Sequence, residues 1–479
     1  IKKKLIYKAE SFKNLMNKKL FLLTTSLASF LIPFTTNLIS FTIPQIGKTY
    51  DVSFMLVVWV PLSFLISLTS FMIIFGKLSD IYGKVLFFRI GFVLFVLPVF
   101  LIPFAYNIYF LISLVLVMGA GAALFGTNTV AIISQVIPKE KRGSALGINS
   151  MSVYTGLVTS ILLGSALLDL IGWKYIFLID IPIALTGLFI SFISMKGFEI
   201  KNRMTGIDAP GSITFTLSLL LFVVYISSSE IYTWQSTWYL LIMAVIIMLV
   251  FIYIESRSKN PFLDLSLFRD INFSAASLSL FFNYISTYYI VFVFTIYMSI
   301  FLKFSTMETG MVLIAQPVLM ATISPISGRL ADRYGSKELS SVGMATISTA
   351  FFLLYFLNMS SPVIIVIPII MIGLGFGVFS APNTNSAMYS VEKNKLGIAS
   401  GTLGTIRYTG QLLSIAIASL ILSSSMPRAM LLQMFAGIYT GNTVYKQAFL
   451  SGFKEVMLLS AILTLTGSFI SLLKSRERL

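Results

Sequence analysis

Long apolar runs separated by short polar stretches dominate the chain. Segments such as 54–75, 90–109 and 236–254 carry almost no charge and have about the 20 residues that a helix needs to span a bilayer. The alternating ten-residue strands of a membrane barrel are absent. The pattern predicts an all-α polytopic membrane protein. The fourteen predicted transmembrane helices are 20–44, 53–75, 85–105, 108–136, 144–168, 174–196, 209–229, 235–255, 271–301, 309–327, 338–358, 361–389, 397–424 and 452–473.

One polar stretch occurs twice between apolar runs. Gly76-Lys77-Leu78-Ser79-Asp80-Ile81-Tyr82-Gly83-Lys84 is repeated 252 residues later as Gly328-Arg329-Leu330-Ala331-Asp332-Arg333-Tyr334-Gly335-Ser336-Lys337. We interpret both as tight turns whose acids cap a helix or pair with a nearby basic residue. They are then either gates between two conformations or plain loops that set topology. The candidate gate residues are Gly76, Asp80, Gly83, Lys84, Gly328, Arg329, Asp332, Arg333 and Gly335.

The duplication extends beyond these turns. At a spacing of 254 residues, Gly119, Gly121 and Phe125 match Gly373, Gly375 and Phe379. Two six-helix halves joined directly would lie closer together than this, so the surplus predicts two inserted helices. The expected fold is therefore 6 + 2 + 6 helices. Its parts are an N-terminal six-helix bundle with a basic tail over 1–197, a linker pair over 198–260 and a C-terminal bundle over 261–479.

Composition excludes most enzyme chemistry. The chain is 57% hydrophobic and 11% charged, and it contains neither cysteine nor histidine. Disulfides, thiol chemistry and metal sites built from thiolate or imidazole are impossible. No phosphate-binding loop of the G-x-x-x-x-G-K-[ST] type is present. We therefore expect no enzymatic activity, no cofactor and no metal.

The net charge of +16 follows membrane topology. Basic residues gather at the N-terminus and in alternate loops, which predicts a plasma-membrane protein with both termini in the cytoplasm. That distribution argues against nucleic acid as a partner. The lysines of residues 1–19 followed by an apolar run resemble a signal peptide. The run continues to about residue 43, however, without a clear cleavage site, so we expect a retained first helix.

Acidic residues avoid the predicted membrane interior. All 18 Asp and Glu residues fall near helix ends or in loops, and Asp180 and Asp208 come nearest to being embedded. A carboxylate that carries protons across a membrane normally faces the inside of the helix bundle. Asp180 is therefore the candidate for a coupling group.

Polar residues within apolar spans are candidates for a substrate cavity. Each could equally be a hydrogen-bonding tie between helices. Arg407, which we place inside a helix, leaves the same two alternatives open, and Tyr288 and Tyr289 could face a cation or belong to an interfacial aromatic belt. Gly119, Gly121, Gly156 and Gly164 are candidates for close helix packing. The cavity candidates are Thr35, Asn37, Asn128, Asn149, Tyr154, Asn283, Tyr284, Gln316, Asn383, Asn385, Arg407 and Gln411.

Several motifs in order resemble the major facilitator superfamily, specifically its fourteen-helix drug:proton antiporter branch. The duplicated G-x-L-[SA]-D-x-x-G stretch is similar to the family's loop signature. Residues 138–147 are similar to its loop before helix 5, residues 173–182 to its segment opening helix 6, and residues 397–410 to its helix 13 pattern. The resemblance implies alternating access, export of lipophilic or amphipathic compounds in exchange for protons, and a working monomer in the bilayer.

The chain departs from the branch at three sites. Thr35 stands where helix 1 would carry an aspartate, Val115 and Met118 stand where helix 4 would carry arginine and glutamine, and Ile161 replaces a helix 5 proline. Two alternatives therefore stay open. One is a facilitator or specific metabolite exporter without proton coupling. The other is a non-transporting receptor or subunit of a larger complex. The apolar stretch 425–451 is expected to be an outer loop that lies along the membrane or covers the outer mouth.

Overall fold

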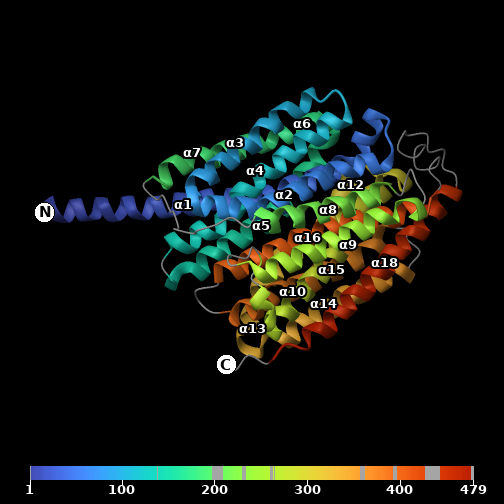
Figure 1. Ribbon diagram of the computed structural model, residues 1–479. Coiled ribbons are helices and arrows are strands. Elements are labelled where there is room, and N and C mark those ends of the chain that lie inside the picture. Colours follow the sequence, from blue (N-terminus) through green and yellow to red (C-terminus); the bar gives the residue numbers. More distant parts are fainter. Residues whose placement is uncertain are drawn as a thin grey trace.

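The protein is an elongated bundle of roughly parallel helices in the computed structural model (Figure 1). The structure describes residues 2–137, 139–196, 209–228, 234–258, 263, 265–356, 362–391, 396–426 and 443–475. These residues contain no β-strand. They contain thirteen helical stretches that are long and apolar enough to cross a membrane, and α8 adds the shorter apolar segment Pro210–Ile226. The predicted all-helical membrane fold is thereby confirmed.

The N-terminal part of the chain forms eight α-helices and two 3₁₀ turns before the middle of the sequence. Their bounds are α1 Lys2–Tyr50, α2 Phe54–Tyr82, α3 Lys84–Leu101, η1 Ile102–Phe104, α4 Ile108–Val136, α5 Lys139–Ile171, α6 Trp173–Ile176, η2 Phe177–Ile179, α7 Asp180–Ser194 and α8 Ala209–Ser228.

The remaining described elements run from α9 to α18. Their bounds are α9 Trp234–Arg257, η3 Leu265–Arg269, α10 Ile271–Thr287, α11 Ile290–Ile296, the π-helix η4 Tyr297–Phe301, α12 Thr306–Leu313, α13 Ala315–Tyr334, α14 Ser336–Phe356, α15 Pro362–Tyr389, α16 Leu396–Ser424 and α18 Thr443–Ser471.

The first helix is longer than predicted. It begins at Lys2 rather than at residue 20 and ends at Tyr50, and its N-terminal part extends beyond the rest of the bundle (Figure 1). The basic tail and the first apolar run are therefore one helix. The last helix also begins earlier than residue 452, at Thr443. The proposed outer loop is thus shorter than 425–451, and its residues 427–442 lie outside the described part of the chain.

The duplicated polar stretches are helical, which corrects their interpretation as turns. α2 continues through Asp80 to Tyr82, and α13 continues through Asp332 to Tyr334. A single glycine separates each from the next helix, Gly83 with φ 129° and Gly335 with φ 92°. These positive φ values are favourable only for glycine. Gly76 instead lies inside α2, where an added Cβ would come within 2.9 Å of Thr127 Cγ2.

The repeat is matched by equivalent packing of helix pairs. A Cβ on Gly121 of α4 would lie 2.5 Å from the backbone nitrogen of Phe95 on α3. A Cβ on Gly375 of α15 would lie 2.6 Å from the carbonyl oxygen of Gly343 on α14. Both contacts are closer than a side chain allows, so glycine is needed wherever these helices cross. The two sequence copies thus form the same local structure.

Helices far apart in the sequence contact one another at several places, among them α2 with α16, α1 with α11 and α5 with α12. Asp169 of α5 accepts hydrogen bonds from the hydroxyl of Thr306 at 2.7 Å and from its backbone nitrogen at 3.2 Å. A Cβ on Gly310 of α12 would collide with Ser165 of α5. α8 packs along α9 and also contacts α2 and α16. The loop ends of α5 and α12 are therefore held together in this conformation.

Candidate functional site

Three predicted membrane helices are divided into separate α-helices in the structure. One division, between α12 and α13 at Ile314, contains none of the candidate site residues, and the other two do. The segment predicted as one helix over 174–196 is divided into α6, the 3₁₀ turn η2 and α7. The segment predicted over 271–301 is divided at Tyr288 and Tyr289, between α10 and α11. The first break is followed by Pro182, which cannot donate a backbone hydrogen bond to the carbonyl of Leu178, whereas the second contains neither proline nor glycine. Helix interruptions of this kind in membrane proteins are tolerated where neighbouring groups satisfy the freed backbone, and they commonly accompany function.

The first interruption buries Asp180, the first residue of α7. Its side chain is 0% exposed, and its Oδ2 accepts a hydrogen bond from the Thr35 hydroxyl of α1 at 3.1 Å. Its Oδ1 has no hydrogen-bond partner among the described residues. The chain thus places a carboxyl group inside a membrane-spanning segment with only half of its polar atoms satisfied. Such a group is costly and is a functional candidate by default.

Thr35 stands at the helix 1 position where the resemblance implies an aspartate. Its hydroxyl contacts the acid of helix α7 instead. The interior of the N-terminal half therefore contains a carboxyl group near this position, supplied by another helix. The scarcity of acids in the sequence pointed to Asp180, but nothing in the sequence indicated its partner.

The second interruption lies against α16. Arg407, Gly410, Gln411 and Ser414 recur at helical spacing and so share one face of that helix. A Cβ on Gly410 would lie 3.0 Å from Tyr284 Cβ on α10. Ser414 Oγ accepts a hydrogen bond at 3.0 Å from the backbone nitrogen of Tyr289, at the break itself. α16 therefore supplies Ser414 as the hydrogen-bond acceptor at the break, and it also places Arg407 in the space beside the break.

A cluster of tyrosines surrounds Arg407. The guanidinium carbon lies 5.6 Å from the centroid of the Tyr284 ring, and Tyr408 and Tyr154 also interact with it electrostatically. The Nε of Arg407 has no hydrogen-bond partner among the described residues. We call Arg407, Tyr154, Tyr284 and Tyr408 the Arg407 cluster.

The Arg407 cluster joins helices from both sequence repeats. The Tyr154 hydroxyl on α5 lies 3.1 Å from Ser380 Oγ on α15. Tyr288 shares a side-chain hydrogen bond with Thr36 of α1 and interacts electrostatically with Tyr408 and Tyr284. Thr36 is adjacent in sequence to Thr35, which contacts Asp180. α1 thus contacts Asp180 through Thr35 and Tyr288 through Thr36.

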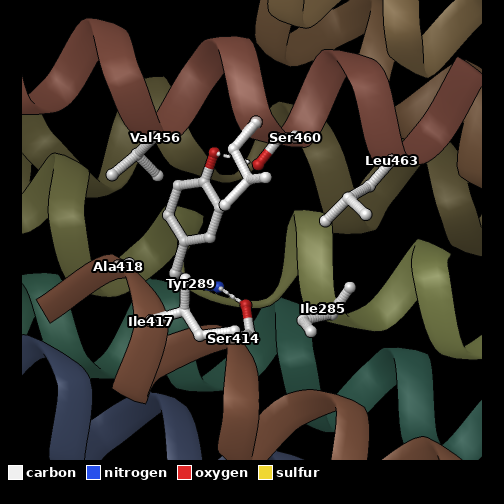
Figure 2. Close-up of a pocket in the computed structure, with 9 residues that line it drawn as sticks. Ile285, Tyr289, Ser414, Ile417, Ala418, Val456, Ser460 and Leu463 are labelled. Atoms are coloured by element: carbon white, nitrogen blue, oxygen red, sulfur yellow. Dashed lines mark hydrogen bonds between the residues drawn. The ribbon is translucent and has the colours of Figure 1, made fainter. Parts of the chain in front are cut away.

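Tyr289 does not belong to an interfacial aromatic belt. It is 1% exposed, and its hydroxyl lies 2.9 Å from Ser460 Oγ on α18. Figure 2 shows the small pocket beside it, with the hydroxyl directed at Ser460 and the backbone nitrogen at Ser414. The pocket has room for about one water molecule. It is a packing defect at the helix break and is too small for a substrate.

Several other predicted cavity residues act as ties within the bundle. Asn149 donates to Ser29 Oγ at 2.6 Å and to the Thr25 carbonyl at 3.3 Å, which joins α5 to α1. Asn383 donates to the Ala276 carbonyl at 3.0 Å. Asn128 donates to the Leu124 carbonyl of its own helix at 2.8 Å. Asn149 and Asn383 thus bond to neighbouring helices and Asn128 to its own helix, and the assignment of all three to a substrate cavity stays a prediction.

The remaining candidates do not form one group. Asn283 donates to Met344 Sδ at 3.4 Å, within the C-terminal part of the bundle. Asn37, Gln316 and Gln411 are buried, whereas Asn385 is exposed. The described side chains include neither Asp80 nor Asp332 or Arg333, and Asp208 lies outside the described residues.

The packing glycines make close contacts. A Cβ on Gly119 would lie 2.5 Å from the Phe64 carbonyl oxygen of α2. A Cβ on Gly156 would collide with the Phe30 carbonyl of α1, and one on Gly164 would lie 3.1 Å from Leu38.

Sequence reasoning missed a buried lysine near the C-terminus. Lys474, expected in the basic tail, is 1% exposed and donates to Asn383 Oδ1 at 2.7 Å. It also missed Glu255 on α9, which is 2% exposed and accepts a hydrogen bond from the backbone nitrogen of Leu263. Both residues lie at the ends of apolar runs. Their charge therefore predicted that both side chains are exposed to solvent, and no other feature of the sequence contradicted that prediction. Among the described residues, no group of three or more acids could hold a metal ion.

Known proteins similar to this chain are membrane transporters. It is 27% identical over 382 residues to the riboflavin transporter RibZ of Clostridioides difficile, covering 80% of this chain and 82% of that protein. It is 25% identical over 406 residues to the multidrug resistance protein Stp of Mycobacterium tuberculosis, covering 84% of this chain and 75% of that protein.

The fold resembles solved transporter structures. One is the xylose transporter XylE from E. coli in a partially occluded inward-open conformation, with a TM-score of 0.61, 13% identity, and coverage of 94% of this chain and 96% of that one. Another is a bacterial homolog of the human lysosomal transporter Spinster in an inward-facing conformation, with a TM-score of 0.64, 14% identity, and coverage of 96% and 97%. Because residues 25–415 match the Major Facilitator Superfamily, this chain belongs to that family of secondary transporters and not to a family of enzymes.

Proposed function

We propose that this transporter exports lipophilic or amphipathic compounds in exchange for protons and that Asp180 carries the proton. The supporting observation is the burial of Asp180 with one oxygen bonded to Thr35 and the other without a partner. An ionised carboxylate in such a place is costly to keep. A proton bound to Asp180 would remove that charge, and a movement that opens the site to water would release it.

The proposed movement is a rocking of two six-helix halves, within 1–197 and 261–479, about the Arg407 cluster. The inserted pair α8 and α9 would link them in a 6 + 2 + 6 arrangement. The matched glycine contacts of α3 with α4 and of α14 with α15 support this division, as does the contact of α8 with both α2 and α16. The duplicated stretches ending at Gly83 and Gly335 would form the gate at one end of the bundle. The Asp169–Thr306 contact would hold the opposite end closed.

The topology proposed for this movement keeps both termini in the cytoplasm of a plasma-membrane protein. It follows from the distribution of basic residues. A working monomer suffices for this mechanism.

A second candidate function is export of one specific metabolite. It is favoured by the similarity to a protein described as a riboflavin transporter. The multidrug resistance proteins among the relatives favour the broader substrate range instead. A facilitator would move its substrate only downhill, and a non-transporting subunit would move none.

Transport by the purified protein in liposomes separates these functions. The probes are rhodamine 6G and fluorescein, followed with and without an imposed pH gradient and compared with protein-free liposomes. We expect gradient-dependent uphill movement of at least one dye. Downhill movement alone would show that the protein is a facilitator and does not exchange its substrate for protons. If the folded protein moves neither dye in either condition, export of amphipathic compounds is wrong.

A further inference from the structure

Arg407 is a cation with no acidic partner among the residues that the structure describes. It lies on α16 within the membrane span Gly401–Ser424. Its guanidinium faces the Tyr284 ring at 5.6 Å, inside the range of about 6 Å for a cation–π contact. Tyr408 and Tyr154 complete the surroundings. Tyrosine is uncharged at neutral pH because its hydroxyl titrates near pH 10. The cluster thus has positive charge and aromatic faces.

This arrangement leaves bonding capacity unused. An arginine offers five N–H donors in a planar fork, and the Nε of Arg407 has no partner among the described residues. Arg407 is partly buried, and its cation–π contact, worth about 0.5–2 kcal/mol, leaves the buried Nε without a hydrogen bond. An acceptor brought by a ligand would supply the missing bonds.

A second arginine shows what a structurally tied guanidinium looks like in this protein. Arg89 on α3 also lies over an aromatic ring, that of Phe192 at 4.4 Å. Its Nε donates to Ser191 Oγ at 3.2 Å and its Nη2 to the Ser191 carbonyl at 2.9 Å. Arg89 is therefore satisfied by its neighbours in α7. Arg407 has the ring contact without the equivalent Nε bond.

The position of the cluster suits a transported ligand. Tyr154 belongs to α5 and contacts Ser380 of α15, so the residues around Arg407 come from both sequence repeats. A ligand bound here would contact both parts that must move relative to one another.

We propose that the Arg407 cluster binds an acidic group of a planar aromatic substrate. Arg407 pairs with the carboxylate or a similar anionic oxygen of that substrate, and the tyrosines pack against its rings. The inference rests on the proposed transport function and narrows its substrate class to aromatic anions. A guanidinium binds a planar carboxylate with two parallel bonds, which a lysine cannot reproduce.

Two dyes that share a xanthene ring system test the charge preference directly. Fluorescein is an anion at neutral pH and rhodamine 6G is a cation. Their dissociation constants are measured by fluorescence polarisation on the purified protein in detergent, without any gradient. We expect wild type to bind fluorescein more tightly than rhodamine 6G. Arg407→Gln should weaken fluorescein binding about ten- to hundredfold, the range for one or two lost charge-assisted bonds.

Further variants serve as controls for charge, for position and for folding. Arg407→Lys retains the positive charge but not the planar guanidinium, so its preference for fluorescein should be weaker than that of the wild type but stronger than that of Arg407→Gln. Arg89→Gln removes a matched arginine outside the cluster and should leave the ratio of the two constants unchanged. If Arg407→Gln fails to fold, as judged by size-exclusion profile and melting temperature, Arg407→Lys and Tyr284→Leu carry the test.

Two results would overturn the inference. One is a wild-type preference for rhodamine 6G, and the other is a constant ratio of the two affinities across the folded cluster variants. Because binding needs no gradient, the outcome is separable from the proposed exchange. Charge-selective binding without gradient-driven transport would refute proton exchange alone. Gradient-driven transport with an unchanged affinity ratio would refute only the assignment of the Arg407 cluster.

Discussion

The interruptions before α7 and between α10 and α11 differ in how their polar groups are satisfied. At the break before α7, Asp180 keeps one oxygen without a partner and receives a single bond from Thr35. At the break between α10 and α11, the Tyr289 backbone nitrogen is bonded to Ser414 and the Tyr289 hydroxyl to Ser460. The first interruption therefore leaves an ionisable group half-satisfied. At the second, both polar groups of Tyr289 are bonded, and the unpartnered group nearby is the neutral hydroxyl of Ser286.

This difference assigns a chemical role to one helix break and a mechanical role to the other. An interruption whose polar groups are all paired lowers the cost of a bend and can act as a flexible point. An interruption that leaves a buried acid half-satisfied carries a cost that packing alone does not explain. We infer that the first break serves proton exchange and the second serves the shape of the helix.

Asp180→Asn should have the largest effect because it removes the ionisable group while keeping its size and its bond with Thr35. Gradient-driven dye accumulation should fall to the level of protein-free liposomes. Dye binding in detergent should stay within the range of wild type. Liposome transport and fluorescence polarisation measure the two properties separately. Full gradient-driven accumulation by the folded variant would remove Asp180 from the mechanism.

Thr35→Val should have the next largest effect at this break. Valine has nearly the shape of threonine but cannot donate to Asp180, so the acid loses the one side-chain hydrogen bond that the structure gives it. Leaving such a group unsatisfied costs about 1–3 kcal/mol. The melting temperature should fall, and gradient-driven transport should weaken. Thr35→Ser keeps the hydroxyl and should restore both. Identical behaviour of the Val and Ser variants would show that the hydrogen bond is unimportant.

The sequence predicted Asp180 but neither of the breaks. Acids are so scarce in the apolar spans that Asp180 was conspicuous from composition alone. The first break does have a local cause, because Pro182 cannot donate a backbone hydrogen bond to the carbonyl of Leu178. Residues 288–289 have no such signal, and their aromatic side chains fit a continuous membrane helix. The second break depends on tertiary partners such as Ser414, which a one-dimensional pattern does not specify.

The duplicated glycine motif led to a wrong prediction of tight turns, because the role of a glycine also depends on its tertiary surroundings. Its glycines suggested tight turns, yet Gly76 lies within α2 and allows a close contact with Thr127. Only Gly83 and Gly335, with their positive φ, end a helix. Glycine signals either backbone freedom or lack of a side chain, and the sequence alone does not distinguish the two. Spacing therefore predicted the repeat correctly while the local structure was wrong.

Ser414→Ala tests the second break. Without Ser414 Oγ, the Tyr289 backbone nitrogen loses its acceptor in a buried position. The expected loss is about 1 kcal/mol of stability, seen as a lower melting temperature. Gradient-driven transport at a temperature where the protein is folded should stay close to wild type. If the variant loses gradient-dependent transport while its melting temperature is unchanged, the second break has more than a structural role and the assignment of different roles to the two breaks is wrong.

The smallest effect is expected from removing the Tyr289–Ser460 bond. Tyr289→Phe leaves Ser460 Oγ without its 2.9 Å partner, for a cost of about 0.5–1.5 kcal/mol. Replacing both partners, with Tyr289→Phe and Ser460→Ala together, removes the unsatisfied group and should recover part of that loss. A double-mutant cycle on melting temperature measures the difference. Because the small pocket beside Tyr289 holds at most about one water molecule, neither change should alter dye affinity. A selective loss of dye binding in the single variant would instead place a ligand contact at this break, and the contrast with Asp180 would no longer hold.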